Sequence, residues 1–117
     1  MMANFLFRVT VLSFSSSALA QGYTSYFTGD TADAHTMPLG GVCMMGGATE
    51  FDPAMQWFLD RANGGDVLVL RASGSDGYND YMYNDLGGVN SVETIVFDNG
   101  SASSAPYVAQ RIQRAEA

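Results

Sequence analysis

The sequence contains few of the residues on which several common chemistries depend. It has no lysine, one cysteine and one histidine among 117 residues. A P-loop needs a lysine beside the phosphates, so this chain cannot form one. A single cysteine excludes an internal disulfide, and a single histidine restricts both metal sites and catalytic triads.

Positive charge is also scarce. Twelve acidic residues stand against five arginines, which gives a formal net charge of −7. A nucleic-acid-binding surface needs a basic patch, so we expect no nucleic-acid partner. Hydrophobic residues make up 47% of the chain, which favours a folded domain over disorder. The length allows one domain at most.

The first twenty residues have the pattern of an export signal. The apolar stretch VTVLSF is followed by serines and then by Ala18-Leu19-Ala20, which fits the small-x-small cleavage rule. We expect a signal peptide over residues 1–20, cleavage after Ala20, and a secreted or periplasmic protein without membrane attachment. No apolar run has the length of a membrane-spanning helix. The alternative is a poorly ordered N-terminal tail.

Apolar runs predict three strands in the rest of the chain. Residues 21–38 predict an irregular segment with a short edge strand around Tyr23 to Thr28. The three runs are Gly41 to Met45, Asp66 to Ala72 and Glu93 to Phe97. Four consecutive aliphatic residues in the middle run are typical of a strand buried on both faces. The last run is the weakest of the three, because a glutamate and a threonine open it.

Helical patterns follow each of these runs. Asp52 suits an N-cap, Pro53 suits the first helical position, and Gly64 suits the left-handed residue that ends the helix. The apolar face of this helix has i, i+3, i+4, i+7 spacing and comprises Met55, Phe58, Leu59 and Ala62. The stretch YNDYMYNDL predicts a short helix. A third helix, APYVAQRIQRAEA, would place on one face Val108, Ile112 and Ala115.

The alternation of strands and helices indicates an α/β domain over residues 39–117. Such alternation implies right-handed crossovers and a parallel sheet covered by helices on both faces. Three strands would make a thin sheet with two exposed edges. The sequence ends inside a helical pattern. We therefore expect the N-terminal part of a larger α/β domain.

Two loops are expected to carry the function. Ligands of open parallel α/β sheets bind at the carboxyl ends of the strands, which selects GGATE, Gly46 to Glu50, and SGSDGYND, Ser73 to Asp80. The residues expected to face a substrate are Gly46, Gly47, Thr49, Ser75, Asp76, Tyr78 and Asn79. The alternative for the first loop is a tight turn, and for the second it is a helix cap.

Other chemistries lack their motifs. The dinucleotide fingerprint G-x-G-x-x-G and the nucleophile elbow G-x-S-x-G are absent. DGYND fails as a calcium loop, because a tyrosine stands where that loop needs glycine. Ser73 and Ser75 have no obvious base, since His35 lies in the irregular segment. Cys43 stands among apolar residues and is expected to be a small buried hydrophobe. We expect no cofactor, no metal and no complete triad.

The stretch from MMGGATE to VETIVFDN resembles the first half of the cyanophycinase-like serine peptidases, relatives of the aspartyl dipeptidases. The likeness covers about Gly40 to Ala117, and its most specific parts are GGDVLVLRASGSDGYNDYMY and GVNSVET. It implies a three-layer sandwich of the flavodoxin-like or class I glutamine amidotransferase-like type. It also implies a serine nucleophile on a strand-to-helix elbow, a histidine base and no cofactor. The elbow is not among these residues, so no catalytic residue is assigned. Ala48 stands where the family often has a third glycine.

Two functions remain open on these grounds. The first is the N-terminal fragment of a secreted serine peptidase that cleaves aspartyl or similar peptide bonds in its full-length form and is inactive as this chain alone. The second is a non-catalytic binding or structural α/β module. A peptide is the expected partner of the first, and a homo-oligomer is compatible with either. A nucleotide-binding domain is disfavoured by the missing phosphate motifs.

Overall fold

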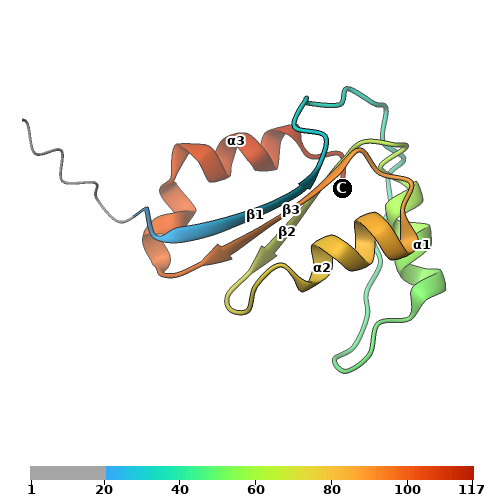
Figure 1. The fold of residues 1–117 in the computed structure, drawn as a ribbon, viewed down its shortest axis with the longest axis horizontal. Helices are drawn as coiled ribbons and strands as arrows, with labels where there is room; N and C mark the ends of the chain where they lie inside the picture. The colour runs from blue at the N-terminus through green and yellow to red at the C-terminus, as the bar shows by residue number, and fades with distance from the viewer. Residues whose placement is uncertain (1–20) are drawn as a thin grey trace, which may run out of the picture.

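The computed structural model describes residues 21–117, and the predicted signal peptide lies outside them. The described part is a small α/β domain with helices on both faces of one sheet (Figure 1). Its strands are β1 (Tyr23–Gly29), β2 (Asp66–Arg71) and β3 (Ser91–Phe97). Its helical elements are α1 (Asp52–Asp60), α2 (Gly77–Asp80), the π-helical η1 (Tyr81–Leu86), the 3₁₀-helical η2 (Gly100–Ser104) and α3 (Pro106–Arg114).

The sheet is mixed, with the strand order β1-β3-β2. β2 and β3 run parallel, with Val67 opposite Val92, as the sequence predicts. β1 lies at an edge, as expected, but it runs antiparallel to β3, with Tyr26 opposite Thr94. The prediction of a wholly parallel sheet is therefore wrong. β1 has no buried residue and alternates between half-buried and exposed positions over Tyr26 to Gly29, which suits an antiparallel edge strand.

The run Gly41 to Met45, predicted as a buried strand, is not a strand in the structure. Its backbone is irregular, and the Val42 and Met44 side chains are 82% and 90% exposed. A strand needs a hydrogen-bonding neighbour. The adjacent edge of β2 is instead bonded in part by the C-terminal residues, since Leu68 N–H donates to Ala117 C=O at 2.8 Å. Cys43, expected to be buried, is half-buried in this run.

The helix α1 confirms the predicted position and apolar face. Pro53 stands in its first turn, and Gly64 adopts the predicted left-handed conformation, with φ +78°. The N-cap is Phe51 rather than Asp52, which belongs to the first helical turn, where a negative charge is favourable. The buried core between this helix and the sheet comprises Met55, Leu59, Ala62, Val67, Met82 and Val92. Phe58 packs against that core.

The helix α3 covers the opposite face of the sheet, and the prediction of its buried face is only partly correct. Val108 is buried, but Ile112 is 51% exposed, and Ala115 lies beyond the helix end. The side chain turned inward is Arg111, because the strand residue beneath the helix is the carboxylate of Glu93. A charged group below the helix thus decides which side of the helix faces the sheet.

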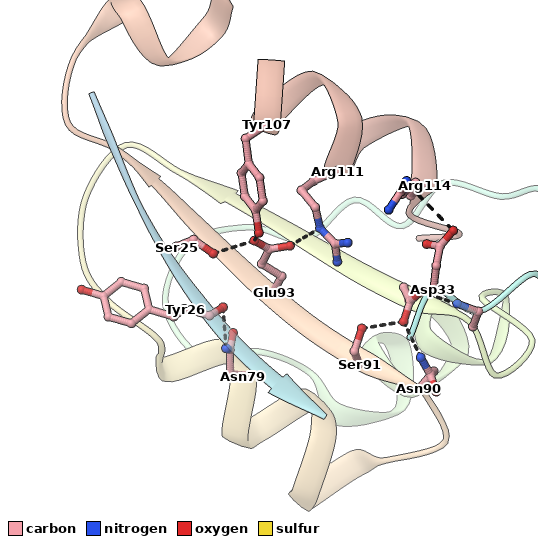
Figure 2. A network of polar contacts seen from close by, with 12 residues as sticks. Ser25, Tyr26, Asp33, Asn79, Asn90, Ser91, Glu93, Tyr107, Arg111 and Arg114 are labelled. Carbon is pink, nitrogen blue, oxygen red and sulfur yellow. Dashed lines mark hydrogen bonds and ion pairs between the residues drawn. The ribbon is translucent and has the colours of Figure 1, made fainter. Parts of the chain in front are cut away.

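Glu93 lies at the centre of a buried polar network that joins three elements (Figure 2). Its carboxylate accepts hydrogen bonds from Ser25 Oγ of β1 at 2.5 Å and from Tyr107 OH of α3 at 2.6 Å. It also forms an ion pair with Arg111 of α3. The run judged weakest from the sequence is therefore the central strand, and its glutamate is a core residue.

Asp66 forms a second buried network at the start of β2. Its carboxylate accepts hydrogen bonds from Ser91 Oγ at 2.5 Å, Asn90 Nδ2 at 2.7 Å and Ala34 N–H at 2.9 Å. Burial alone would raise the pKa of Asp66, but the hydrogen bonds from Ser91, Asn90 and Ala34 outweigh it and leave the pKa below its ordinary value. These bonds hold the start of β2 against β3 and the preceding segment.

The low pKa of Asp66 predicts a contribution to acid sensitivity. Its stabilising effect is fully present above the unfolded pKa of 3.8 and is lost as the pH falls through the lower folded pKa. In urea titrations between about pH 6 and about pH 2, the free energy of unfolding should fall more steeply with acid in the wild type than in Asp66→Asn. Asp76→Asn, which changes an exposed carboxylate, should keep the wild-type slope. An unchanged slope in Asp66→Asn would contradict this assignment.

Candidate binding site at the carboxyl end of β2

A cavity of about 550 Å³ lies at the carboxyl end of β2. Its apolar lining comes from β2, α1, η1 and the irregular segment, through Val69, Leu70, Met55, Met82 and Met45. Its polar lining comes from the two loops that the sequence selects and from the end of β2. These polar residues are Glu50, Arg71, Ser73 and Tyr78. The cavity is therefore an apolar surface bordered by a few charged and polar groups, as in many ligand sites.

The loop after β2 is folded around the Arg71 side chain. Arg71 lies two residues after Val69 on the strand. Both side chains therefore lie on the face of the sheet that α1 and α2 cover. The Arg71 guanidinium lies 5.1 Å from the centre of the Tyr78 ring, and its Nη1 donates to the Ser75 carbonyl at 3.3 Å. Gly74 has φ +98°, and a Cβ there would lie 2.8 Å from Arg71 Cζ. Only glycine allows this approach.

A tyrosine joins the two loops. Tyr78 OH donates a hydrogen bond of 2.5 Å to Glu50 Oε1. This bond lowers the pKa of Glu50 and raises the pKa of Tyr78. A parallel bond of 2.6 Å from Tyr81 OH to Asp52 raises the pKa of Tyr81 to about 12. At neutral pH the cavity therefore presents a carboxylate at Glu50 and a guanidinium at Arg71, on either side of a neutral Tyr78.

The structure brings only some of the predicted site residues to this cavity. Gly46 and Tyr78 line it. Gly47 and Thr49 are exposed in the turn and are not part of the lining. Ser75 contributes its carbonyl to Arg71, and the Asp76 carbonyl accepts from Asn79 N–H at 2.8 Å at the start of α2.

Asn79 points into the sheet rather than toward the cavity. Its Nδ2 donates to the Tyr26 carbonyl at 3.0 Å and to Thr28 Oγ1 at 3.3 Å, and its Oδ1 accepts from Thr94 Oγ1 at 2.7 Å. Figure 2 shows the side chain directed at β1. The side chain therefore anchors α2 to the sheet, which is the structural role considered for this loop.

The sequence-based list omits the two charged groups of the site. Arg71 ends an aliphatic strand, and Glu50 ends the GGATE loop, so both stand at the expected strand ends. The available signal was the charge itself, because a cation directly after a buried strand requires a partner or solvent. The sequence-based list rests instead on the glycines and on other polar residues of the two loops.

Several catalytic arrangements are absent from residues 21–117. The imidazole of His35 is 87% exposed, its Nε2 lies 3.5 Å from Asp33 Oδ2, and it does not line the cavity that Ser73 borders. No group of three or more histidine, cysteine, aspartate or glutamate side chains is placed to hold a metal ion in this part of the chain.

No helix in this range has the length and hydrophobicity needed to cross a membrane.

Comparisons with protein-family models, curated proteins and solved structures give no match for this chain. The chemical capacity of the site is therefore inferred from its own geometry. A guanidinium and a carboxylate beside an apolar surface complement a small ligand that carries both charges.

The bond between Tyr78 and Glu50 predicts a measurable coupling. In Tyr78→Phe the Glu50 carboxylate loses its strongest stabilising contact, so its pKa should rise toward the ordinary 4.5. An NMR titration of glutamate side-chain carboxyl carbons measures this directly. Tyr81→Phe is the matched control, because that hydroxyl donates to Asp52 instead, and Glu50 should then titrate as in the wild type. Equal Glu50 pKa values in wild type and Tyr78→Phe would contradict the assignment.

Proposed function

We propose that this chain is the substrate-binding N-terminal part of a secreted cyanophycinase-like serine peptidase. The whole domain would be a three-layer sandwich of the flavodoxin-like or class I glutamine amidotransferase-like type and would hydrolyse aspartyl or similar peptide bonds. Two likenesses in the sequence support this, GGDVLVLRASGSDGYNDYMY and GVNSVET. The observation that carries the proposal is the position of the first stretch, whose loop forms a wall of the cavity at the carboxyl end of β2.

The charges of the cavity suit an aspartyl peptide. The Arg71 guanidinium can donate paired hydrogen bonds to a carboxylate, which gives both strength and orientation. The Glu50 carboxylate can accept from an α-amino group, and its low pKa keeps it charged for that purpose. Tyr78 holds both groups, through its ring and its hydroxyl. The described residues thus bind and orient the peptide.

Bond cleavage is assigned to residues other than these. Ser73 borders the cavity, but a serine needs a base within hydrogen-bond reach, and His35 is not among the residues that line this cavity. The second candidate function, a non-catalytic binding or structural module, follows from the same absence of a serine–histidine pair in residues 21–117. The two candidates share the binding step and differ in turnover by the full-length protein.

Aspartyl dipeptides test the proposed binding by isothermal titration calorimetry. We expect saturable binding of a free aspartyl dipeptide and no hydrolysis by this chain. Arg71→Gln should weaken binding about tenfold to a hundredfold, because it removes a charge-assisted pair. Arg114→Gln, on α3 beyond the opposite face of the sheet, is the matched control and should bind as the wild type does. Equal affinities of Arg71→Gln and Arg114→Gln for the dipeptide would contradict the assignment of Arg71 to the binding site.

A second variant separates binding from loop folding, since Arg71 also holds its own loop. Glu50→Gln should weaken binding of the free dipeptide but leave binding of the N-acetylated dipeptide unchanged, because acetylation removes the charged amine that Glu50 recognises.

Hydrolysis of the dipeptide by the wild-type chain that disappears in Ser73→Ala would overturn the assignment of bond cleavage to other residues.

A further inference from the structure

One side chain holds the two charged groups of the candidate site. Tyr78 OH donates to Glu50 Oε1 at 2.5 Å, and the Tyr78 ring lies 5.1 Å from the Arg71 guanidinium. The separation and orientation of the Glu50 and Arg71 side chains therefore depend on where Tyr78 lies. Whatever fixes Tyr78 also fixes the site.

The helical turn that carries Tyr78 has little stability of its own. α2 has only four residues, begins at Gly77, and has no side-chain hydrogen bond at its N-cap. The π-helical η1, a type of segment that is rare and frequent at functional sites, follows it directly. A single turn of helix is not stable in water without tertiary contacts. Contacts with the sheet therefore decide where α2 lies.

The buried amide of Asn79 supplies the polar part of these contacts. The residue is 2% exposed. Its Nδ2 donates to the Tyr26 carbonyl and to Thr28 Oγ1 of β1, and its Oδ1 accepts from Thr94 Oγ1 of β3 at 2.7 Å. The bond to the carbonyl of β1 can be followed in Figure 2. One side chain thus joins α2 to the edge strand and to the central strand.

The partner of Asn79 in the central strand lies away from the cavity. Thr94 is fully buried, two residues after Val92 on the face of the sheet that α1 and α2 cover, and it is not among the residues that line the candidate site. Without the Asn79 oxygen its hydroxyl would be a buried donor that has lost its acceptor, which is unfavourable. An aspartate in place of Asn79 would lack the amide donors and would bury a charge.

The position of Asn79 is transmitted to Tyr78 because the two residues are consecutive in one turn. Neighbouring residues of a helix point about 100° apart, so Asn79 faces the sheet while Tyr78 faces the two loops. A shift of α2 that breaks the bonds of Asn79 therefore moves the Tyr78 ring and hydroxyl as well.

We propose that Asn79 and Thr94 are positioning residues of the candidate site, because their buried hydrogen bond holds α2 where Tyr78 reaches both Glu50 and Arg71. They act through Tyr78 and do not contact the ligand. The effect on peptide binding rests on the proposed function, whereas the effect on the geometry of the site does not.

NMR titration of the Glu50 carboxyl group tests the positioning without a ligand. Thr94→Val keeps the shape of the side chain and removes the hydroxyl, and Asn79→Ala removes all three hydrogen bonds. In both variants the bond from Tyr78 to Glu50 should weaken, so the pKa of Glu50 should rise toward the ordinary 4.5. Thr94→Ser retains the hydroxyl, and its Glu50 should titrate as in the wild type.

A variant on the other face of the sheet shows whether lost stability alone has this effect. Val108→Ala truncates a buried side chain of α3, so it should lower stability and leave the pKa of Glu50 unchanged. Protected β3 amides show that a variant is folded, and Thr94→Val decides if Asn79→Ala is not. A wild-type pKa of Glu50 in either folded variant, or an equal rise in Val108→Ala, would overturn the proposal.

The affinity for an aspartyl dipeptide separates this inference from the proposed function. If both hold, Thr94→Val should weaken binding about twofold to thirtyfold although it changes no residue of the cavity. A raised pKa of Glu50 in Thr94→Val, together with no binding by the wild type, would contradict the proposed function alone. An unchanged pKa together with wild-type affinity in Thr94→Val would contradict the positioning alone.

Discussion

The buried carboxylate of Glu93 is the constraint on which the arrangement of the layers depends. A carboxylate in the centre of a sheet is strongly unfavourable unless it is paired and hydrogen-bonded. Glu93 obtains its partners from two other elements, Ser25 of β1 and both Tyr107 and Arg111 of α3. The need to satisfy one group therefore holds the edge strand and the helix against β3 at the same time (Figure 2).

The opposite face of the sheet is held differently, and it positions the candidate site. There α1 and η1 pack on β2 and β3 through an apolar core, and Asn79 ties α2 to β1 and β3. Because α1 and α2 are held in place in this way, Tyr78 of α2 lies between Arg71 and Glu50. The polar network around Glu93 thus holds β1 and α3 against β3. The apolar core on the other face of the sheet holds the helices that line the cavity.

Local patterns in the sequence predicted much of this fold. The apolar spacing of α1, the left-handed Gly64 after it, the aliphatic run of β2 and the edge position of β1 follow from residues close in sequence, and the structure confirms them. The direction of β1, the burial of Glu93 and the irregular backbone of Gly41–Met45 depend on neighbours distant in sequence. The same holds for the site, because Arg71 and Glu50 gain their roles only where two loops meet.

A mutant cycle on the Glu93–Arg111 pair tests the role of the buried carboxylate most directly, by urea unfolding at neutral pH. Arg111→Leu should lower the free energy of unfolding by about 3–5 kcal/mol, because it leaves a buried charge unpaired. Arg114→Leu, which removes a half-exposed partner of Asp33, should cost less than about 1 kcal/mol. Adding Glu93→Leu to Arg111→Leu should restore much of the loss. Strictly additive losses in that double variant would contradict the account.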